Sequence, residues 1–253
     1  MTCRLGYDIA GRVGAPVLVL GSSLGTTRAM WAPQQAALCE RFLVVRYDHL
    51  GHGESTVPPG PYTMDILADA VQDLVDRLGI ERFHYAGLSL AGMVGMALAA
   101  RLPERIDRLA LLCTSAHLTP AQAWLDRAHQ VHAHGTASIA ETVVGRWFTP
   151  AFTGRADYLE MLSAISDEGY AACCAAIAAM DLRPALAAIT APTLVIAGRD
   201  DPAIPPEHGR LIADAIAGAR FAEIPGAAHL ANVERPAEVT ALLLAHLGGT
   251  PVD

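Results

Sequence analysis

The clearest chemical signal in the sequence surrounds Ser89. An apolar run, Phe83–Ala86, leads into Gly87–Gly92 (GLSLAG), and an apolar helical pattern follows. A strand, a serine between small residues and a helix are the context of a nucleophile elbow, a sharp turn that exposes the serine hydroxyl above a sheet edge. Small neighbours are needed because this turn brings backbone segments close together. The pattern predicts that Ser89 is a nucleophile.

Two less favoured interpretations of this segment are a dinucleotide site and an inert turn. The spacing of Gly87 and Gly92 is one residue away from a G-x-G-x-x-G pattern, and Asp107 follows Gly87 by 20 residues, as a ribose-binding acid would. Ser89, however, places a side chain where the backbone would have to approach a pyrophosphate. We therefore favour the elbow.

A base and an acid follow in the chain order Ser, Asp, His, which is usual after an elbow. The apolar run Pro192–Ala197 predicts a strand that ends just before Asp200 and Asp201, and Phe221–Ile224 predicts a short strand before His229. The carboxyl ends of parallel strands gather functional groups at one sheet edge. We expect His229 to take the serine proton, and one of the two aspartates to orient its imidazole.

The oxyanion hole is expected from backbone amides close to the serine. One donor is the N–H of Leu90, the residue after the nucleophile. The second is expected from Gly21–Thr26, a loop of small residues after the predicted strand Pro16–Leu20. Such amides stabilise the negative charge that develops on the carbonyl oxygen of an ester under attack.

These groups require a parallel sheet to position them. Short runs rich in Val and Leu alternate with helical patterns, which predicts an α/β fold with a doubly wound, mostly parallel sheet. The remaining strands are predicted at Phe42–Arg46 and Leu109–Cys113. Helices are predicted at Thr63–Leu78, Leu90–Leu102, Glu207–Ala217 and Pro236–Leu247, and Thr63 is predicted to be an N-cap.

One long stretch interrupts this alternation. Residues 119–180 carry helical patterning without a convincing strand, and they are too many for a simple crossover. We predict a helical lid at 117–183, inserted into an α/β core formed by 1–116 and 184–253, and we term residues 117–183 the lid segment. Its first helix is predicted to begin with Thr119 as the cap and Pro120 at the first helical position.

The amino-acid composition excludes several classes of function. The 253 residues carry a net charge of −8 and include no lysine, which excludes P-loop and Schiff-base chemistry and argues against nucleic acid. No apolar run approaches the roughly 20 residues of a membrane span, and the first residues lack a secretory pattern. The five cysteines, two of them adjacent, fit a reduced chain. We expect a cytoplasmic protein with no nucleic-acid or membrane partner.

Two groups of histidines suggest metal binding at first sight. Asp48, His49 and His52 follow a predicted strand. The second group, at helical spacing in the lid segment, comprises His129, His132 and His134. Metal sites need a more complete ligand set, so we interpret the first group as a structural turn and the second as a polar helix face. We expect neither a metal nor an organic cofactor.

With these motifs, the chain resembles the α/β-hydrolase superfamily and, within it, the 3-oxoadipate enol-lactonase family of the β-ketoadipate pathway. The resemblance covers nearly the whole chain. Two departures are Leu50, where the family has Arg, and Ala91, where it has Gly. The matching segments are Ser22–Thr26, Met30–Gln34, Arg46–Asp48, Gly51–Ser55, Gly60–Thr63, Gly87–Ser89, Arg146–Thr149, Gly169–Ile177, Met180–Arg183 and Ala228–Glu234.

The resemblance implies roles for individual residues. Ser89 would be the nucleophile and His229 the base. Asp201 would be the acid rather than Asp200, because the family's acid falls three positions after the glycine that ends the strand, here Gly198. The implied oxyanion donors are the backbone N–H groups of Leu24 and Leu90.

An acidic protein that binds an anionic substrate needs a local cation. Trp124 and Arg127 lie three positions apart on a predicted helix, Ala121–His134, so they share a face. The resemblance also points to this pair as substrate-facing. Arg146, beside Trp147, is the alternate candidate. An arginine can hold a carboxylate with two parallel N–H bonds.

The resemblance implies that a small anionic lactone, 3-oxoadipate enol-lactone, is hydrolysed through an acyl-enzyme to 3-oxoadipate. A general carboxylesterase or a cofactor-free perhydrolase would use the same serine chemistry. A ligand receptor is a third hypothesis, because fold alone does not decide function. A homo-oligomer is also compatible with the sequence.

Overall fold

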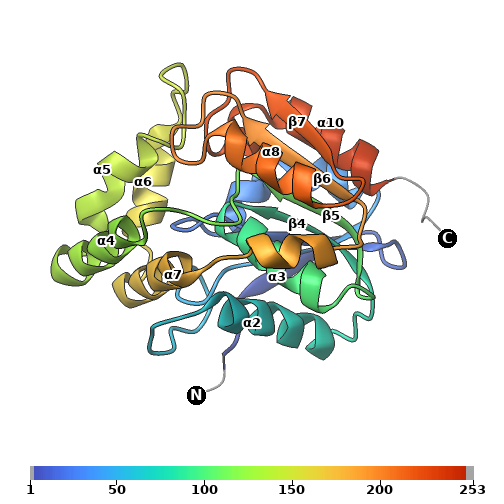
Figure 1. Cartoon of the computed structure of the whole chain (residues 1–253), viewed down its shortest axis with the longest axis horizontal. Helices are drawn as coiled ribbons and strands as arrows, with labels where there is room; N and C mark the ends of the chain where they lie inside the picture. The colour runs from blue at the N-terminus through green and yellow to red at the C-terminus, as the bar shows by residue number, and fades with distance from the viewer. Residues whose placement is uncertain (1–2, 249–253) are drawn as a thin grey trace.

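The computed structural model describes residues 3–248, which are built around one seven-stranded sheet (Figure 1). The strand order is β1-β3-β2-β4-β5-β6-β7, in which β1 pairs antiparallel with β3 and every other pairing is parallel. This confirms the predicted α/β fold with a mostly parallel sheet. The strands are β1 (Tyr7–Gly11), β2 (Val17–Gly21), β3 (Leu43–Tyr47), β4 (Phe83–Leu88), β5 (Ile106–Leu112), β6 (Thr193–Gly198) and β7 (Arg220–Ile224).

Helices pack against this sheet and against one another. In Figure 1, α2, α3 and α8 lie in front of the sheet, whereas α1 packs on α10. As predicted, Thr63 is the N-cap of α2, and its side chain accepts a hydrogen bond from the Ile66 N–H (3.2 Å). The helices outside the lid segment are η1 (Arg28–Trp31), α1 (Ala32–Cys39), α2 (Met64–Arg77), α3 (Leu90–Arg101), η3 (Arg183–Ala188, which begins at the last residue of that segment), α8 (Pro206–Ala215), α9 (Ala231–Glu234) and α10 (Pro236–Leu247).

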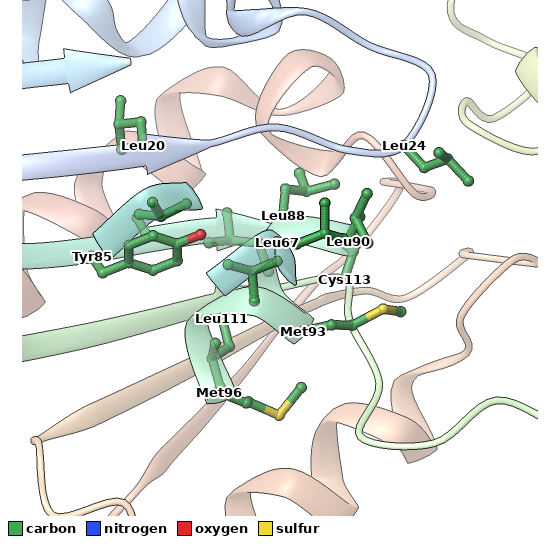
Figure 2. Close-up of a cluster of buried hydrophobic side chains, with 14 of the residues drawn as sticks. Leu20, Leu24, Leu67, Tyr85, Leu88, Leu90, Met93, Met96, Leu111 and Cys113 are labelled. Atoms are coloured by element: carbon green, nitrogen blue, oxygen red, sulfur yellow. The ribbon is translucent and has the colours of Figure 1, made fainter. Parts of the chain in front are cut away.

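The interior strands explain the continuous apolar runs in the sequence. β4 and β6 are buried along their whole length, as expected for parallel strands that are covered on both faces. Figure 2 shows Leu88 and Leu90 within a cluster of buried side chains that includes Leu20 and Met93. Since Leu88 and Leu90 are the two neighbours of Ser89, the turn at Ser89 is anchored in the core on both sides.

The first strand and the first α-helix have no counterpart among the predicted elements. β1 alternates between exposed and half-buried residues and pairs only with β3. An antiparallel edge strand of this kind carries a much weaker apolar signal than a buried parallel strand. The α1 segment, Ala32–Cys39, is short and likewise buries few side chains. Both elements depend on contacts with the rest of the fold more than on local pattern.

Between β5 and β6 every regular element of the described chain is a helix, and α4, α5, α6 and α7 lie to one side of the sheet (Figure 1). The start of α4 differs from the prediction, because Pro120 is an extended N-cap residue (φ −78°, ψ 140°) and Ala121 is the first helical one. The fixed φ of proline suits both conformations, so the assignment of Thr119 as the cap is wrong. The elements are α4 (Ala121–His134), η2 (Thr136–Ile139), α5 (Ala140–Val144), α6 (Arg155–Ser163) and α7 (Asp167–Ala179).

The division into a core and a lid at 117–183 stays a prediction. Its outermost positions, residues 1–2 and 249–253, lie outside the described residues. Within residues 3–248, no helix has both the length and the apolar character that a membrane span requires.

Candidate active site

Ser89 lies in the sharp turn that connects β4 to α3. Its backbone has a positive φ (57°, ψ −113°), which is strained for a residue with a side chain. Two hydrogen bonds hold the turn: the Ser89 N–H donates to the Leu112 carbonyl (2.8 Å), and the Thr114 hydroxyl donates to the Ser89 carbonyl (2.7 Å). Strain retained at one serine by surrounding contacts is the backbone geometry that a nucleophile elbow requires.

Close packing explains the small residues around Ser89. A side chain at Gly87 would overlap the backbone of Ala91. Ala91 is the residue that departs from the family pattern, and its Cβ would lie 2.5 Å from a Cβ built on Gly21. The absence of a side chain on Gly21, at the end of β2, therefore makes room for the methyl group of Ala91.

His229 and Asp201 are brought together from two loops that follow β7 and β6. His229 Nδ1 donates a hydrogen bond to Asp201 Oδ2 (2.8 Å). The second oxygen of the same carboxylate accepts from the N–H groups of Ala203 (2.8 Å) and Ile204 (3.0 Å). Both side chains are buried, at 4% and 3% exposure, whereas Asp200 is exposed. The aspartate that faces the histidine is therefore Asp201.

Ser89 and His229 border one cavity of about 230 Å³. That volume lies below the usual range of about 300–1,000 Å³ for ligand pockets, so the cavity suits a small ligand. Residues of the predicted core and of the lid segment both line it. The wall comprises Ser23, Leu24, Ser89, Leu118, Thr119, Pro120, Ala123, Trp124, Arg127, Val143, Arg146, Trp147, Tyr170, Ala203, Ile204 and His229.

The two expected oxyanion donors lie on different elements. Leu90 is the first residue of α3, so its N–H is one of the helix N-terminal amides that have no acceptor within the helix. Leu24 lies in the loop of residues 21–26 after β2, which we term the β2 loop, and it borders the cavity. The helix dipole of α3 adds a partial positive charge at the same end.

Two buried histidines hold the β2 loop. The Gly25 N–H donates to His52 Nε2 (3.0 Å), and His49 Nε2 donates to the Ser22 carbonyl (2.8 Å). These are the histidines that the sequence placed in a structural turn, but their contact with the β2 loop was not foreseen. The available signal was the Gly-His-Gly motif, residues 51–53. This motif does not indicate which segment the His52 ring will contact.

The protonation state of His52 matters for this contact. His52 Nδ1 donates to the Leu50 carbonyl (3.1 Å), which leaves Nε2 to accept from the β2 loop. Burial lowers the pKa of His52 to about 4 and that of His49 to about 3. Both rings are therefore neutral at neutral pH, and for His52 this is what an accepting Nε2 requires.

All four predicted substrate-binding residues border the cavity from the lid segment. The Arg127 guanidinium carbon lies 4.5 Å from the Trp124 ring centre, a cation–π contact. Arg127 is half-buried and has no ion-pair partner among the residues that the structure describes. Arg146 is exposed, whereas its neighbour Trp147 is buried. Burial thus distinguishes Arg127 from Arg146.

The carboxylate of Glu234, whose role was not predicted from the sequence, joins the loop of residues 225–230, which we term the His229 loop, to the lid segment. Glu234 Oε2 accepts from the Ala228 N–H (2.8 Å), and Oε1 accepts from the N–H (3.0 Å) and the hydroxyl of Thr149. The Leu230 N–H donates directly to the Trp147 carbonyl (3.0 Å). Both neighbours of His229 are therefore held on the segment 147–149.

The two groups of residues considered as metal ligands do not form a ligand set in the structure. Asp48 is paired with Arg28, and its carboxylate also accepts from the Arg28 N–H (2.6 Å). His129, His132 and His134 are exposed on α4. Among residues 3–248, no group of three or more His, Cys, Asp or Glu side chains is arranged to hold a metal ion. The absence of a metal requirement stays a prediction.

Comparison with known proteins adds independent information. Residues 16–236 match the family described as alpha/beta hydrolase fold. The chain is 39% identical to 3-oxoadipate enol-lactonase 2 of Acinetobacter baylyi over 92% of this chain and 88% of that protein. The crystal structure of the enol-lactonase from Burkholderia xenovorans superposes with a TM-score of 0.95, at 42% identity, over 98% of this chain and 97% of that one.

A third similarity is to an enzyme described as an esterase. The thermophilic esterase from Thermogutta terrifontis, with malate bound, superposes with a TM-score of 0.91 at 31% identity. The match covers 97% of this chain and 93% of the esterase.

Proposed function

The chain belongs to the α/β-hydrolase family, and from this premise we propose that it is a serine hydrolase that opens the ring of 3-oxoadipate enol-lactone to give 3-oxoadipate. The observation that carries the proposal is the hydrogen-bonded pair His229–Asp201 beside a strained Ser89 in one small cavity. The similarity to two enol-lactonases along nearly the whole chain supports the choice of substrate.

In the first half of the reaction, the Ser89 hydroxyl attacks the lactone carbonyl and His229 takes its proton. Asp201 keeps the imidazole in the tautomer whose Nε2 can accept, and it stabilises the imidazolium that forms. The carbonyl oxygen becomes an oxyanion between the N–H groups of Leu24 and Leu90. Each such donor contributes about 2.7–4 kcal/mol to transition-state stabilisation.

Collapse of this intermediate breaks the ring C–O bond and leaves the acyl group on Ser89. The leaving oxygen is an enol oxygen, to which His229 returns the proton, and the enol then tautomerises to the ketone. Water, deprotonated by His229, attacks the acyl-enzyme in the second half. The product leaves as a carboxylate, and the serine recovers its proton.

The lid segment supplies recognition in this proposal. Arg127 carries a positive charge at the cavity wall that no carboxylate of the described residues neutralises, so it can pair with the carboxylate of the substrate. Trp124, against which the guanidinium lies, shields that pair from water. Arg146 and Trp147 line the same cavity, with the exposed Arg146 as the alternate carboxylate partner. We place the enzyme in the cytoplasm, in line with its five unpaired cysteines.

The test sets turnover of the enol-lactone beside turnover of a neutral activated ester, 4-nitrophenyl acetate. A kcat/KM for the lactone at least about thirtyfold higher is expected if the charged pair contributes the 2–5 kcal/mol typical of desolvated charges. Comparable values would identify a general carboxylesterase or perhydrolase, an alternative favoured by the similarity to the Thermogutta esterase. Tight binding of the lactone without turnover would identify a receptor.

A further inference from the structure

Tyr170 is a buried polar side chain that the proposed mechanism leaves unused. It lies on α7 and has 0% exposure, yet its hydroxyl proton has no acceptor among the described residues. The other fully or nearly buried tyrosines all have one: Tyr47 and Tyr85 bond to each other (2.7 Å), and Tyr62 donates to the Pro58 carbonyl (2.8 Å). Buried tyrosine hydroxyls normally find a partner, so the missing partner at Tyr170 requires an explanation.

The position of Tyr170 suggests what that partner is. The residue forms part of the wall of the cavity that Ser89 and His229 border. Its ring rests on the β2 loop, since a Cβ built on Gly25 would lie 3.2 Å from Tyr170 Cε2. The ring therefore packs on the β2 loop, and Arg127 of α4 lies close to the hydroxyl.

The electrostatic surroundings favour a hydroxyl that remains protonated. Burial raises the pKa of Tyr170 well above its ordinary value, and the Arg127 guanidinium, through its charge and its hydrogen-bonding contact with the hydroxyl oxygen, lowers it by less. The side chain is thus a donor at any physiological pH. Arg127 is also a donor and lacks an ion-pair partner within residues 3–248. Apart from their contact with each other, these two adjacent donors have no acceptor among the described residues, and such a pair in a cavity wall is suited to binding an anion.

We propose that the Tyr170 hydroxyl donates a hydrogen bond to the substrate carboxylate and, with Arg127, forms the carboxylate subsite of the cavity. The inference rests on the proposed function, because it assigns a second recognition group to the same substrate. Arg127 supplies the positive charge. Tyr170 supplies a hydrogen bond of fixed direction, because its ring is packed against the β2 loop. The subsite and the β2 loop are thereby linked through one side chain.

The test is Tyr170→Phe, which removes only the hydroxyl oxygen. We expect kcat/KM for the enol-lactone to fall by about 10- to 100-fold, the loss typical of a hydrogen bond to a charged group. Turnover of 4-nitrophenyl acetate should stay within about twofold of wild type, since that ester has no carboxylate. The matched control is Tyr158→Phe, a lid-segment tyrosine outside the cavity wall, which should leave both activities unchanged.

Inhibition by adipate tests the same subsite without the lactone. Adipate carries the carboxylate but no scissile bond, so it should compete with 4-nitrophenyl acetate, and Tyr170→Phe should raise its inhibition constant about tenfold. The double variant with Arg127→Ala should lose less than the product of the two single losses, because both groups act on one anion.

The outcomes separate this inference from the proposed function. A wild-type protein that does not hydrolyse the lactone overturns the proposed function, and unchanged adipate inhibition in Tyr170→Phe then overturns the subsite as well. A Tyr170→Phe variant with wild-type lactone turnover overturns the subsite alone. Equal losses on lactone and ester also overturn it, because they would show a structural role for the hydroxyl.

Discussion

At the residue scale, the site depends on a strained serine whose neighbours are all anchored. Ser89 has a positive φ, and its backbone N–H and carbonyl are both hydrogen-bonded to the strand β5 and the residues after it. A residue held in such a conformation needs surrounding contacts to compensate for the strain. A substitution that keeps this backbone conformation and removes the hydroxyl therefore tests whether the hydroxyl itself is needed for the reaction.

Ser89→Ala should lower kcat by at least about a thousandfold on any substrate, because the members of a catalytic triad act as a unit. The alanine methyl adds no bulk, so the far-UV spectrum and the melting temperature should stay close to those of wild type. Steady-state kinetics on variant protein made without contact with the wild-type enzyme measures this. Retention of more than a tenth of the activity would show that Ser89 is not the nucleophile.

Asp201→Asn should cost orders of magnitude in kcat, whereas Asp200→Asn should cost little. An amide N–H opposite Nδ1 favours the wrong imidazole tautomer, and only Asp201 is bonded to His229 (2.8 Å). The exposed Asp200 serves as the matched control, since the two residues are adjacent and the change is the same. The reverse ranking would assign the role of acid to Asp200.

At the element scale, the loops after the strands are coupled to the lid segment. The His229 loop is attached to residues 147–149 by the Glu234 carboxylate and by the bond from Leu230 to Trp147. The β2 loop is attached to the Gly-His-Gly turn by His49 and His52. His229, the proposed base, therefore has its position set partly by a segment whose residues also line the cavity.

Glu234→Gln should lower kcat by about tenfold on the lactone and on a neutral ester alike, with little change in KM. An amide nitrogen cannot accept a hydrogen bond, so either the Ala228 N–H or Thr149 loses its partner, and a lost bond to a charged group costs about 1.5–3 kcal/mol. The exposed Glu238, changed to Gln, is the control and should behave as wild type. A raised KM with unchanged kcat would contradict a role in positioning His229.

At the scale of the whole molecule, the parallel sheet gathers the chemistry at one edge. The β2 loop, the elbow after β4 and the loops after β6 and β7 all leave the carboxyl ends of parallel strands, although their residues are far apart in the chain. Folding also buries several histidines in neutral form. Burial lowers the pKa of His246 to about 4, as it does for His52.

This burial predicts a loss of stability in mild acid. Between the ordinary histidine pKa of about 6.5 and the lowered folded values, the unfolded chain binds protons that the native protein does not. The free energy of unfolding should therefore fall as the pH decreases from 6.5 to 5, by up to about 1.4 kcal/mol per pH unit for each such histidine. Urea unfolding at several pH values measures the slope.

The variant His246→Gln should flatten that slope, because it removes one of the buried rings at a distance from the catalytic residues. The exposed His134, changed to Gln, is the control and should leave the slope unchanged. A slope that is the same in all three proteins would show that burial of His246 is not linked to acid sensitivity.

The fold class, the place of the elbow and the order of the candidate triad could all be predicted from the sequence. These features have short-range causes. Buried parallel strands require continuous apolar runs, and the turn at Ser89 requires small neighbours such as Gly87, so both leave a local pattern. The weakly patterned edge strand β1 and the start of α4 were missed or misplaced, because pairing and a single ψ angle decide them.

Which side chains meet depends on the packing of remote segments. The structure places Asp201 rather than Asp200 against His229, buries Arg127 more than Arg146 and leaves the Tyr170 hydroxyl proton without an acceptor among the described residues. It also joins Glu234 to Thr149, 85 residues away. Each of these contacts joins segments that are remote in the chain, or depends on burial by such segments. A local pattern carries no information about them, because they exist only when the lid segment and the loops at the sheet edge are packed together.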